Sequence, residues 1–104
     1  MKEIKREELK QKLENNEVIL IEVLDRESYE KSHIKGAINI PLEDIGAEAK
    51  DRFDKDDEIV VYCSDYECTA SPKAARKLDD LGFENVYHYK GGKKDWKDSG
   101  LPME

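Results

Sequence analysis

The sequence predicts an α/β fold with a largely parallel sheet. Short β-branched runs at 18–23 and 58–62 are typical of strands that are buried on both faces. Segments with helical periodicity or helix-start signals lie between the strand-like runs. Strands that alternate with helices of this length are characteristic of parallel sheets.

The elements of the first half follow from local patterns. A helix is expected over 7–13, where Leu9 and Leu13 share one face. Residues 15–16, both Asn, end this helix, and the strand 18–23 follows. We expect a short helix over 26–32 and a short strand over 36–40, which Pro41 stops. Residues 42–53 form a helical or irregular connector.

The second half begins with the clearest strand, 58–62. Ser71 and Pro72 then predict a helix start, because Ser caps free N–H groups and Pro is favoured at the first helical position. Gly82 is a natural end of this helix. A further strand is expected over 85–89 and a last short helix after residues 91–92. Trp96 in this helix is expected to pack in the core with its indole N–H bonded.

Composition bounds the class of protein. The 104 residues suggest one domain spanning 1–104. A net charge of -7 argues against nucleic acid or an anionic membrane as the main partner. The longest apolar run, 18–24, is too short to span a bilayer, and the charged N-terminus does not resemble a signal peptide. A cytoplasmic location is therefore expected.

The two cysteines do not form a disulfide framework, and in a reducing cytosol they are expected to be thiols. A structural zinc site needs four ligands, and only His33 and His88 are available to join the cysteines. Their spacing does not match a zinc finger, so no metal is expected.

Cys63 ends the strand 58–62, and the loop 64–70 leads from it to the predicted helix. Open α/β sheets place their sites at the carboxyl ends of strands. N–H groups of such a loop and of a helix start favour an anion, and they lower the pKa of a nearby thiol. Cys63 is therefore a candidate nucleophile, with a buried thiol of the core as the alternative.

The surrounding motifs identify a family. The sequence resembles single-domain rhodanese-like proteins over nearly its whole length and in the right order. The first motif reads His-Ile-Lys-Gly-Ala-Ile-Asn-Ile-Pro at 33–41, and the second includes Val-Val-Tyr-Cys at 60–63, two Ala at 74–75, two Gly at 91–92, Trp96 and Gly-Leu-Pro at 100–102.

This resemblance implies a five-stranded, mainly parallel sheet with helices on both faces. It implies an enzyme, a sulfurtransferase, in which Cys63 carries a sulfane sulfur as a persulfide. The donor is a small sulfur compound or a protein persulfide, the acceptor is a thiol or cyanide, and no cofactor is required. The loop residues expected to bind substrate are Ser64, Asp65, Tyr66, Glu67, Cys68, Thr69, Ala70 and Ser71.

The loop departs from the usual family pattern Cys-x-x-Gly-x-Arg-Ser. It is two residues longer, has no Gly or Arg, and contains Asp65 and Glu67. Because Arg recruits anionic donors through charge-assisted hydrogen bonds, weak activity with thiosulfate is expected.

Related phosphatases carry Arg six residues after the cysteine, where this chain has Thr69, so phosphatase activity is not expected. Upstream, the family's Asp-Val-Arg reads Glu-Val-Leu at 22–24, with Arg26 as the nearest replacement.

Alternative roles stay open. Cys68 is either a resolving thiol for an intermediate on Cys63 or a small residue packed in the loop. Two further hypotheses are a thiol–disulfide sensor formed by Cys63 and Cys68, and a binding module without enzymatic activity. His33 is expected to support the chain before Gly36, and His88 receives no role.

Overall fold

The computed structural model describes residues 2–104. At its centre is a five-stranded sheet in the order β1-β5-β4-β2-β3, and every neighbouring pair of strands is parallel. The predicted parallel sheet is thereby confirmed. The strands are β1 (Lys2–Glu3), β2 (Ile19–Glu22), β3 (Ile38–Asn39), β4 (Glu58–Tyr62) and β5 (Asn85–His88).

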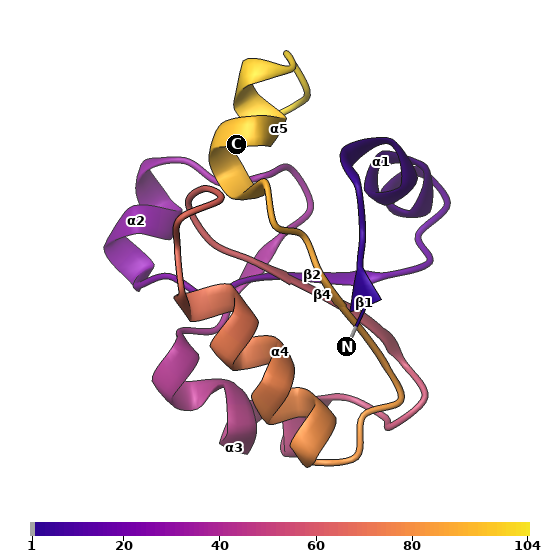
Figure 1. The fold of residues 1–104 in the computed structure, drawn as a ribbon. Helices are drawn as coiled ribbons and strands as arrows, with labels where there is room; N and C mark the ends of the chain where they lie inside the picture. Colours follow the sequence, from indigo (N-terminus) through magenta and orange to yellow (C-terminus); the bar gives the residue numbers. More distant parts are fainter. Residues whose placement is uncertain (1) are drawn as a thin grey trace.

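Helices cover both faces of this sheet (Figure 1), as the sequence resemblance implies. They are α1 (Arg6–Glu14), α2 (Arg26–Lys31), α3 (Ile45–Arg52), α4 (Ala70–Asp80) and α5 (Gly92–Asp98), with a short 3-10 helix η1 (Leu42–Asp44) before α3. In Figure 1, α1 and α5 lie above the sheet and α3 and α4 lie below it.

Strand β4 shows how the sequence divides the core. Ile59 and Val61 pack with the buried residues of α3 and α4, while Val60 and Tyr62 pack on the opposite face with residues such as Leu9 of α1 and Trp96 of α5. All side chains of a strand alternate in this way, so a strand covered on both faces is apolar throughout. Cys63 follows the same alternation, and its side chain packs on the face of the sheet that α3 and α4 cover.

Two local predictions need correction. Strand β1 was not expected, because Lys2 and Glu3 are charged and exposed; they join the sheet by pairing with Tyr87 and His88 of β5. The prediction that Ser71 caps a helix starting at Pro72 is wrong. Helix α4 starts at Ala70, and Ser71 is buried inside its first turn. Pro72 is tolerated there because first-turn N–H groups have no partner within the helix.

The prediction for Trp96 is confirmed. Its ring is buried, and its indole Nε1–H donates to the carbonyl of Pro102 at 2.9 Å. His33 likewise has a structural position, since its ring stacks on Tyr29 and its Nδ1 lies 2.9 Å from the carbonyl of the same residue. The first contact links Trp96 to the segment that follows α5, and the second links His33 to the end of α2.

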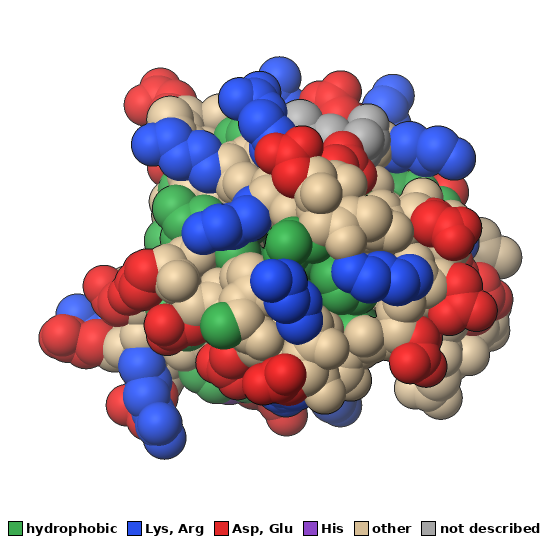
Figure 2. Space-filling model, turned by 90° about the horizontal axis from the view of Figure 1, so that it is seen from below, with side chains coloured by type: hydrophobic (Ala, Val, Ile, Leu, Met, Phe, Trp, Pro, Cys, Tyr) green, Lys and Arg blue, Asp and Glu red, His purple; other side chains and the backbone are tan. Residues whose placement is uncertain are grey.

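The surface carries charges of both signs. Figure 2 shows the face that lies below the sheet in Figure 1, where Lys and Arg side chains occupy the middle and Asp and Glu lie mostly toward the margins. The net charge of -7 is therefore not spread as a uniformly acidic surface.

None of the helices within residues 2–104 has the length and apolar character needed to cross a bilayer.

Candidate active site

Cys63 lies directly after β4, which is flanked by β5 on one side and β2 on the other. The structure thus places this cysteine at the carboxyl end of the central strand, as the sequence pattern indicates. The residue is only 1% exposed.

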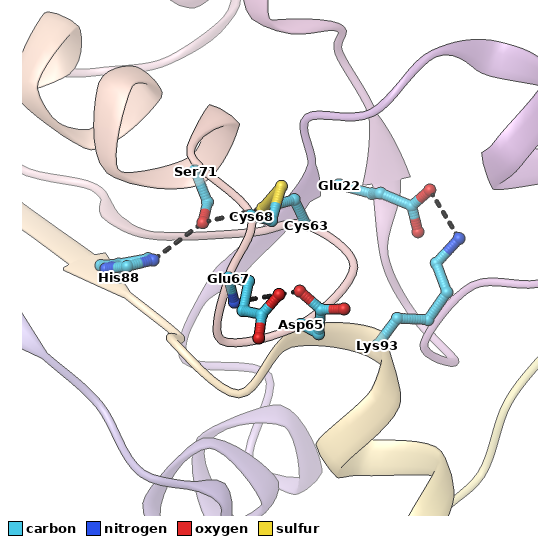
Figure 3. Close-up of a disulfide and its surroundings, with 8 residues drawn as sticks. All are labelled: Glu22, Cys63, Asp65, Glu67, Cys68, Ser71, His88 and Lys93. Atoms are coloured by element: carbon cyan, nitrogen blue, oxygen red, sulfur yellow. Dashed lines mark hydrogen bonds and ion pairs between the residues drawn. A yellow bond between two sulfur atoms is a disulfide. The ribbon is translucent and has the colours of Figure 1, made fainter.

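Cys63 and Cys68 form a disulfide (Figure 3), whereas the sequence favoured two thiols. The loop turns back on itself through Asp65. Its carbonyl accepts from the N–H of Cys68 at 3.3 Å, and its Oδ1 accepts from the N–H of Glu67 at 3.0 Å. The turn leaves the two cysteine Cα atoms 6.3 Å apart, within the range that a disulfide spans. Sequence alone gives no direction to a loop side chain.

A chain of polar contacts leads from Cys63 to His88. The Ser71 hydroxyl oxygen lies 3.2 Å from the Cys63 Sγ and 2.8 Å from the His88 Nε2. Figure 3 shows the three side chains in line, with Ser71 between the other two. A disulfide sulfur has no hydrogen, so a hydrogen bond at Sγ is donated by the Ser71 hydroxyl, and in that arrangement the Nε2–H tautomer of His88 donates to the hydroxyl oxygen.

His88 is the main residue of this site that sequence reasoning missed. It lies on β5, beside β4, and its ring is buried at the same end of the sheet as Cys63. Burial lowers the pKa of His88, and Lys90 lowers it further against the opposing effect of Glu3. A neutral imidazole with a hydrogen on Nε2 supports a thiolate through Ser71 without adding a buried charge. The sequence did contain a signal: side chains alternate along a strand, so His88 lies on the same face of the sheet as the buried Val86.

This burial predicts a pH dependence of stability. An imidazole in the unfolded chain has a pKa of about 6.5, and the pKa of His88 in the folded protein is lower. The unfolded state therefore binds more protons below that pH, so the free energy of unfolding should fall as the pH drops from 6.5. His88→Gln should flatten this decline in denaturant titrations at several pH values. An unchanged slope in the variant would contradict the assignment.

The start of α5 holds the backbone of the loop through hydrogen bonds. The N–H groups of Lys93 and Lys94 donate to the carbonyls of Cys63 and Ser64 at 2.9 and 2.8 Å. Gly92 makes this approach possible: a Cβ at this position would lie 2.6 Å from the Cys63 carbonyl oxygen. Its φ of +65° also favours glycine. The Gly-Gly motif therefore positions the backbone of Cys63.

Helix α5 also takes part in a buried ion pair, through Lys93. Glu22 is fully buried, and its Oε2 is 3.0 Å from the Lys93 Nζ. Its Oε1 accepts from the Tyr62 hydroxyl at 2.8 Å. The interpretation of Arg26 as a replacement for the missing family arginine is not supported, because Arg26 pairs with Glu30 on the exposed side of α2. Lys93 is the residue that meets the buried acid.

The loop itself offers amides and hydroxyls but no cation. Ser64 and Asp65 are half-buried, Tyr66, Glu67 and Thr69 are exposed, and Ser71 is buried. Within residues 2–104, Glu67 and Cys68 use their N–H groups inside the loop, whereas those of Ser64, Asp65, Tyr66, Thr69, Ala70 and Ser71 have no protein acceptor. These N–H groups are the available donors for a bound sulfur species.

Comparison with known proteins gives the same family as the sequence motifs. The model of the rhodanese-like domain family matches residues 5–99. A thiosulfate sulfurtransferase, GlpE of Actinobacillus succinogenes, is 33% identical over 92 residues, which cover 88% of this chain and 80% of the relative. The rhodanese-like domain of the Alr3790 protein from Anabaena has a TM-score of 0.89 and 33% identity, covering 100% of this chain and 79% of that one.

A longer relative also matches. The HTH-type transcriptional regulator Rv0324 of Mycobacterium tuberculosis is 39% identical over 104 residues, or 97% of this chain. This chain spans only 44% of that regulator's length. The similarity therefore concerns one part of the regulator.

Proposed function

Because this chain belongs to the rhodanese-like domain family, we propose that it is a sulfurtransferase that moves a sulfane sulfur through a persulfide on Cys63. The observation that carries the proposal is the position of Cys63. Its sulfur lies at the carboxyl end of the central strand, beside a loop with free N–H groups and within hydrogen-bond distance of Ser71. These groups stabilise a sulfur anion.

The reaction has two balanced steps. In the first, the Cys63 thiolate attacks the outer sulfur of a donor persulfide, and the donor leaves as a thiolate with the electron pair of the broken S–S bond. In the second, an acceptor thiolate attacks the outer sulfur of the Cys63 persulfide and Cys63 leaves as a thiolate. Ser71 donates toward the Cys63 sulfur whenever that atom is anionic. The cycle starts from the reduced protein, because the disulfide occupies the attacking sulfur.

The loop favours donors with little negative charge. It contains Asp65 and Glu67 but no Arg or Lys. The nearby Lys93 is engaged with the buried Glu22, and Lys94 pairs with Asp98. Thiosulfate carries two charges and finds no Arg or Lys within the loop, whereas a protein persulfide or a small organic persulfide needs only the amides. A cytoplasmic location agrees with this chemistry, since reducing conditions keep the two cysteines available.

Steady-state transfer rates test the proposal. In the Cys68→Ser variant, where no second cysteine competes with the acceptor, and with cyanide as acceptor, kcat/KM for glutathione persulfide should exceed that for thiosulfate by about tenfold or more, the equivalent of one charge-assisted hydrogen bond. Double-reciprocal plots should be parallel, as for a covalent intermediate. Cys63→Ala should lower both rates by about 10³-fold or more. Thiosulfate saturation at low micromolar levels contradicts the donor preference, and near-native rates in Cys63→Ala contradict the mechanism and favour a binding module.

The Cys63–Cys68 disulfide favours a second candidate function, a thiol–disulfide sensor. A sensor forms this disulfide with an oxidant and needs no sulfur donor. Rapid disulfide formation by dilute hydrogen peroxide, without any uptake of sulfane sulfur, would support the sensor and contradict the transferase.

A further inference from the structure

Cys68 lies where a second thiol can react with a sulfur on Cys63. Five positions separate the two residues, and the turn through Asp65 brings their sulfur atoms into a bond. Cys68 is half-buried against the core cluster that contains Cys63, while Cys63 itself is almost fully buried. The loop that offers free N–H groups to a bound sulfur thus also holds a resolving thiol beside it.

We propose that the chain releases the sulfane sulfur as hydrogen sulfide, with Cys68 as the resolving cysteine. The inference rests on the proposed persulfide at Cys63. The Cys68 thiolate attacks the Cys63 Sγ, and the bond from Sγ to the outer sulfur breaks. The outer sulfur leaves as HS⁻ with the electron pair of that bond, carrying the proton that Cys68 lost. The sulfane sulfur is reduced to sulfide, and the two cysteine sulfurs are oxidised to the disulfide.

The disulfide seen in the structure is the product of that step. A dithiol reductant completes the cycle. Its thiolate attacks the sulfur of Cys68, the more exposed of the two cysteines, and Cys63 leaves. The second thiol of the reductant then releases Cys68 as the reductant becomes a disulfide. Cys63 is the better leaving group because the Ser71 hydroxyl lies 3.2 Å from its sulfur. Among residues 2–104, the Ser71 hydroxyl lies within hydrogen-bond distance of the Cys63 sulfur, whereas the Cys68 sulfur has no donor at such a distance, and this asymmetry sets the direction of attack.

The proximity of Cys68 to Cys63 determines whether Cys68 or an external thiol attacks the persulfide. An intramolecular thiol in this position acts at a high effective concentration, so it reacts before a dilute external acceptor. Wild-type protein should therefore release sulfide without added thiol. A variant without Cys68 should hold the persulfide until an external acceptor arrives.

A single-turnover experiment without oxygen tests the inference. Fully reduced protein is freed of reductant and mixed with one equivalent of glutathione persulfide, and sulfide and intact mass are followed together. Wild type should release close to one equivalent of sulfide and become lighter than the reduced protein by two hydrogens. Cys68→Ser should gain one sulfur atom and release sulfide about 100-fold more slowly. A dithiol added afterwards should restore the mass of reduced wild type.

The variants separate the two claims. If wild type and Cys68→Ser both keep the added sulfur equally well, the transferase proposal stands and sulfide release through Cys68 is wrong. If neither protein takes up sulfur or releases sulfide, the persulfide on Cys63 and the inference built on it both fail. Cys68→Ala provides a second variant without the hydroxyl, and circular dichroism checks that each variant is folded.

Discussion

Lys93→Met should lower the free energy of unfolding by about 3 kcal/mol or more at neutral pH. The Lys93 Nζ lies 3.0 Å from a Glu22 carboxylate that is 0% exposed. Without the cation, that carboxylate stays buried and keeps only the hydrogen bond from the Tyr62 hydroxyl. A buried charge that loses its partner is among the most destabilising changes a single substitution can make. Denaturant unfolding of the reduced protein measures the effect.

The neighbouring lysine provides a matched control. The Lys94 Nζ also lies 3.0 Å from a carboxylate, that of Asp98, but both side chains are more than half exposed. Lys94→Met should therefore change stability by less than about 1 kcal/mol. The double variant Glu22→Gln with Lys93→Met should recover much of the loss, because it leaves no unpaired charge. Equal losses in Lys93→Met and Lys94→Met would show that burial of the pair has no effect.

Gly92→Ala should destabilise the protein by about 2–5 kcal/mol and displace the active-site loop. The residue has φ of +65°, where an alanine costs about 1–2 kcal/mol. The new Cβ would also lie 2.6 Å from the Cys63 carbonyl oxygen and 3.0 Å from the Asp65 nitrogen. Relief of this overlap costs about 1–3 kcal/mol more. Since backbone must move, the transfer rate should fall together with stability.

Gly100→Ala separates the two contributions. Gly100 has φ of +75°, and a Cβ there would meet no atom within 4 Å. This variant should show only the backbone cost of about 1–2 kcal/mol and should transfer sulfur at a near-native rate. If Gly92→Ala loses no more activity than Gly100→Ala, the close approach of α5 does not position Cys63.

Much of the framework could be predicted because it depends on local patterns. The apolar run at β4 and the position of Cys63 at a strand end both follow from the local sequence pattern. The predicted strand 58–62 has the same bounds as β4 in the structure. The strand β1 was missed because its two charged residues contribute backbone pairing and no buried side chain.

The site contacts could not be predicted, because they join residues far apart in the sequence. Ser71 meets His88 across 17 positions, and Glu22 on β2 meets Lys93 on α5 only in the folded chain. The helix signal at Ser71 was misinterpreted for the same reason, since its hydroxyl serves the sulfur and the imidazole in place of the helix end. The direction of Cys68 depends on the turn at Asp65, which propensity alone does not determine.

The location of the transferred sulfur tests the central claim most directly. Reduced Cys68→Ser protein is treated with one equivalent of glutathione persulfide whose outer sulfur carries a heavy isotope, and the peptides are then mapped by mass spectrometry. We expect one labelled sulfur on the peptide that contains Cys63 and none on any other peptide. The double variant Cys63→Ser with Cys68→Ser should stay unlabelled. Label on this double variant, or no label on Cys63 of the single variant, would contradict the assignment of Cys63 as the sulfur carrier.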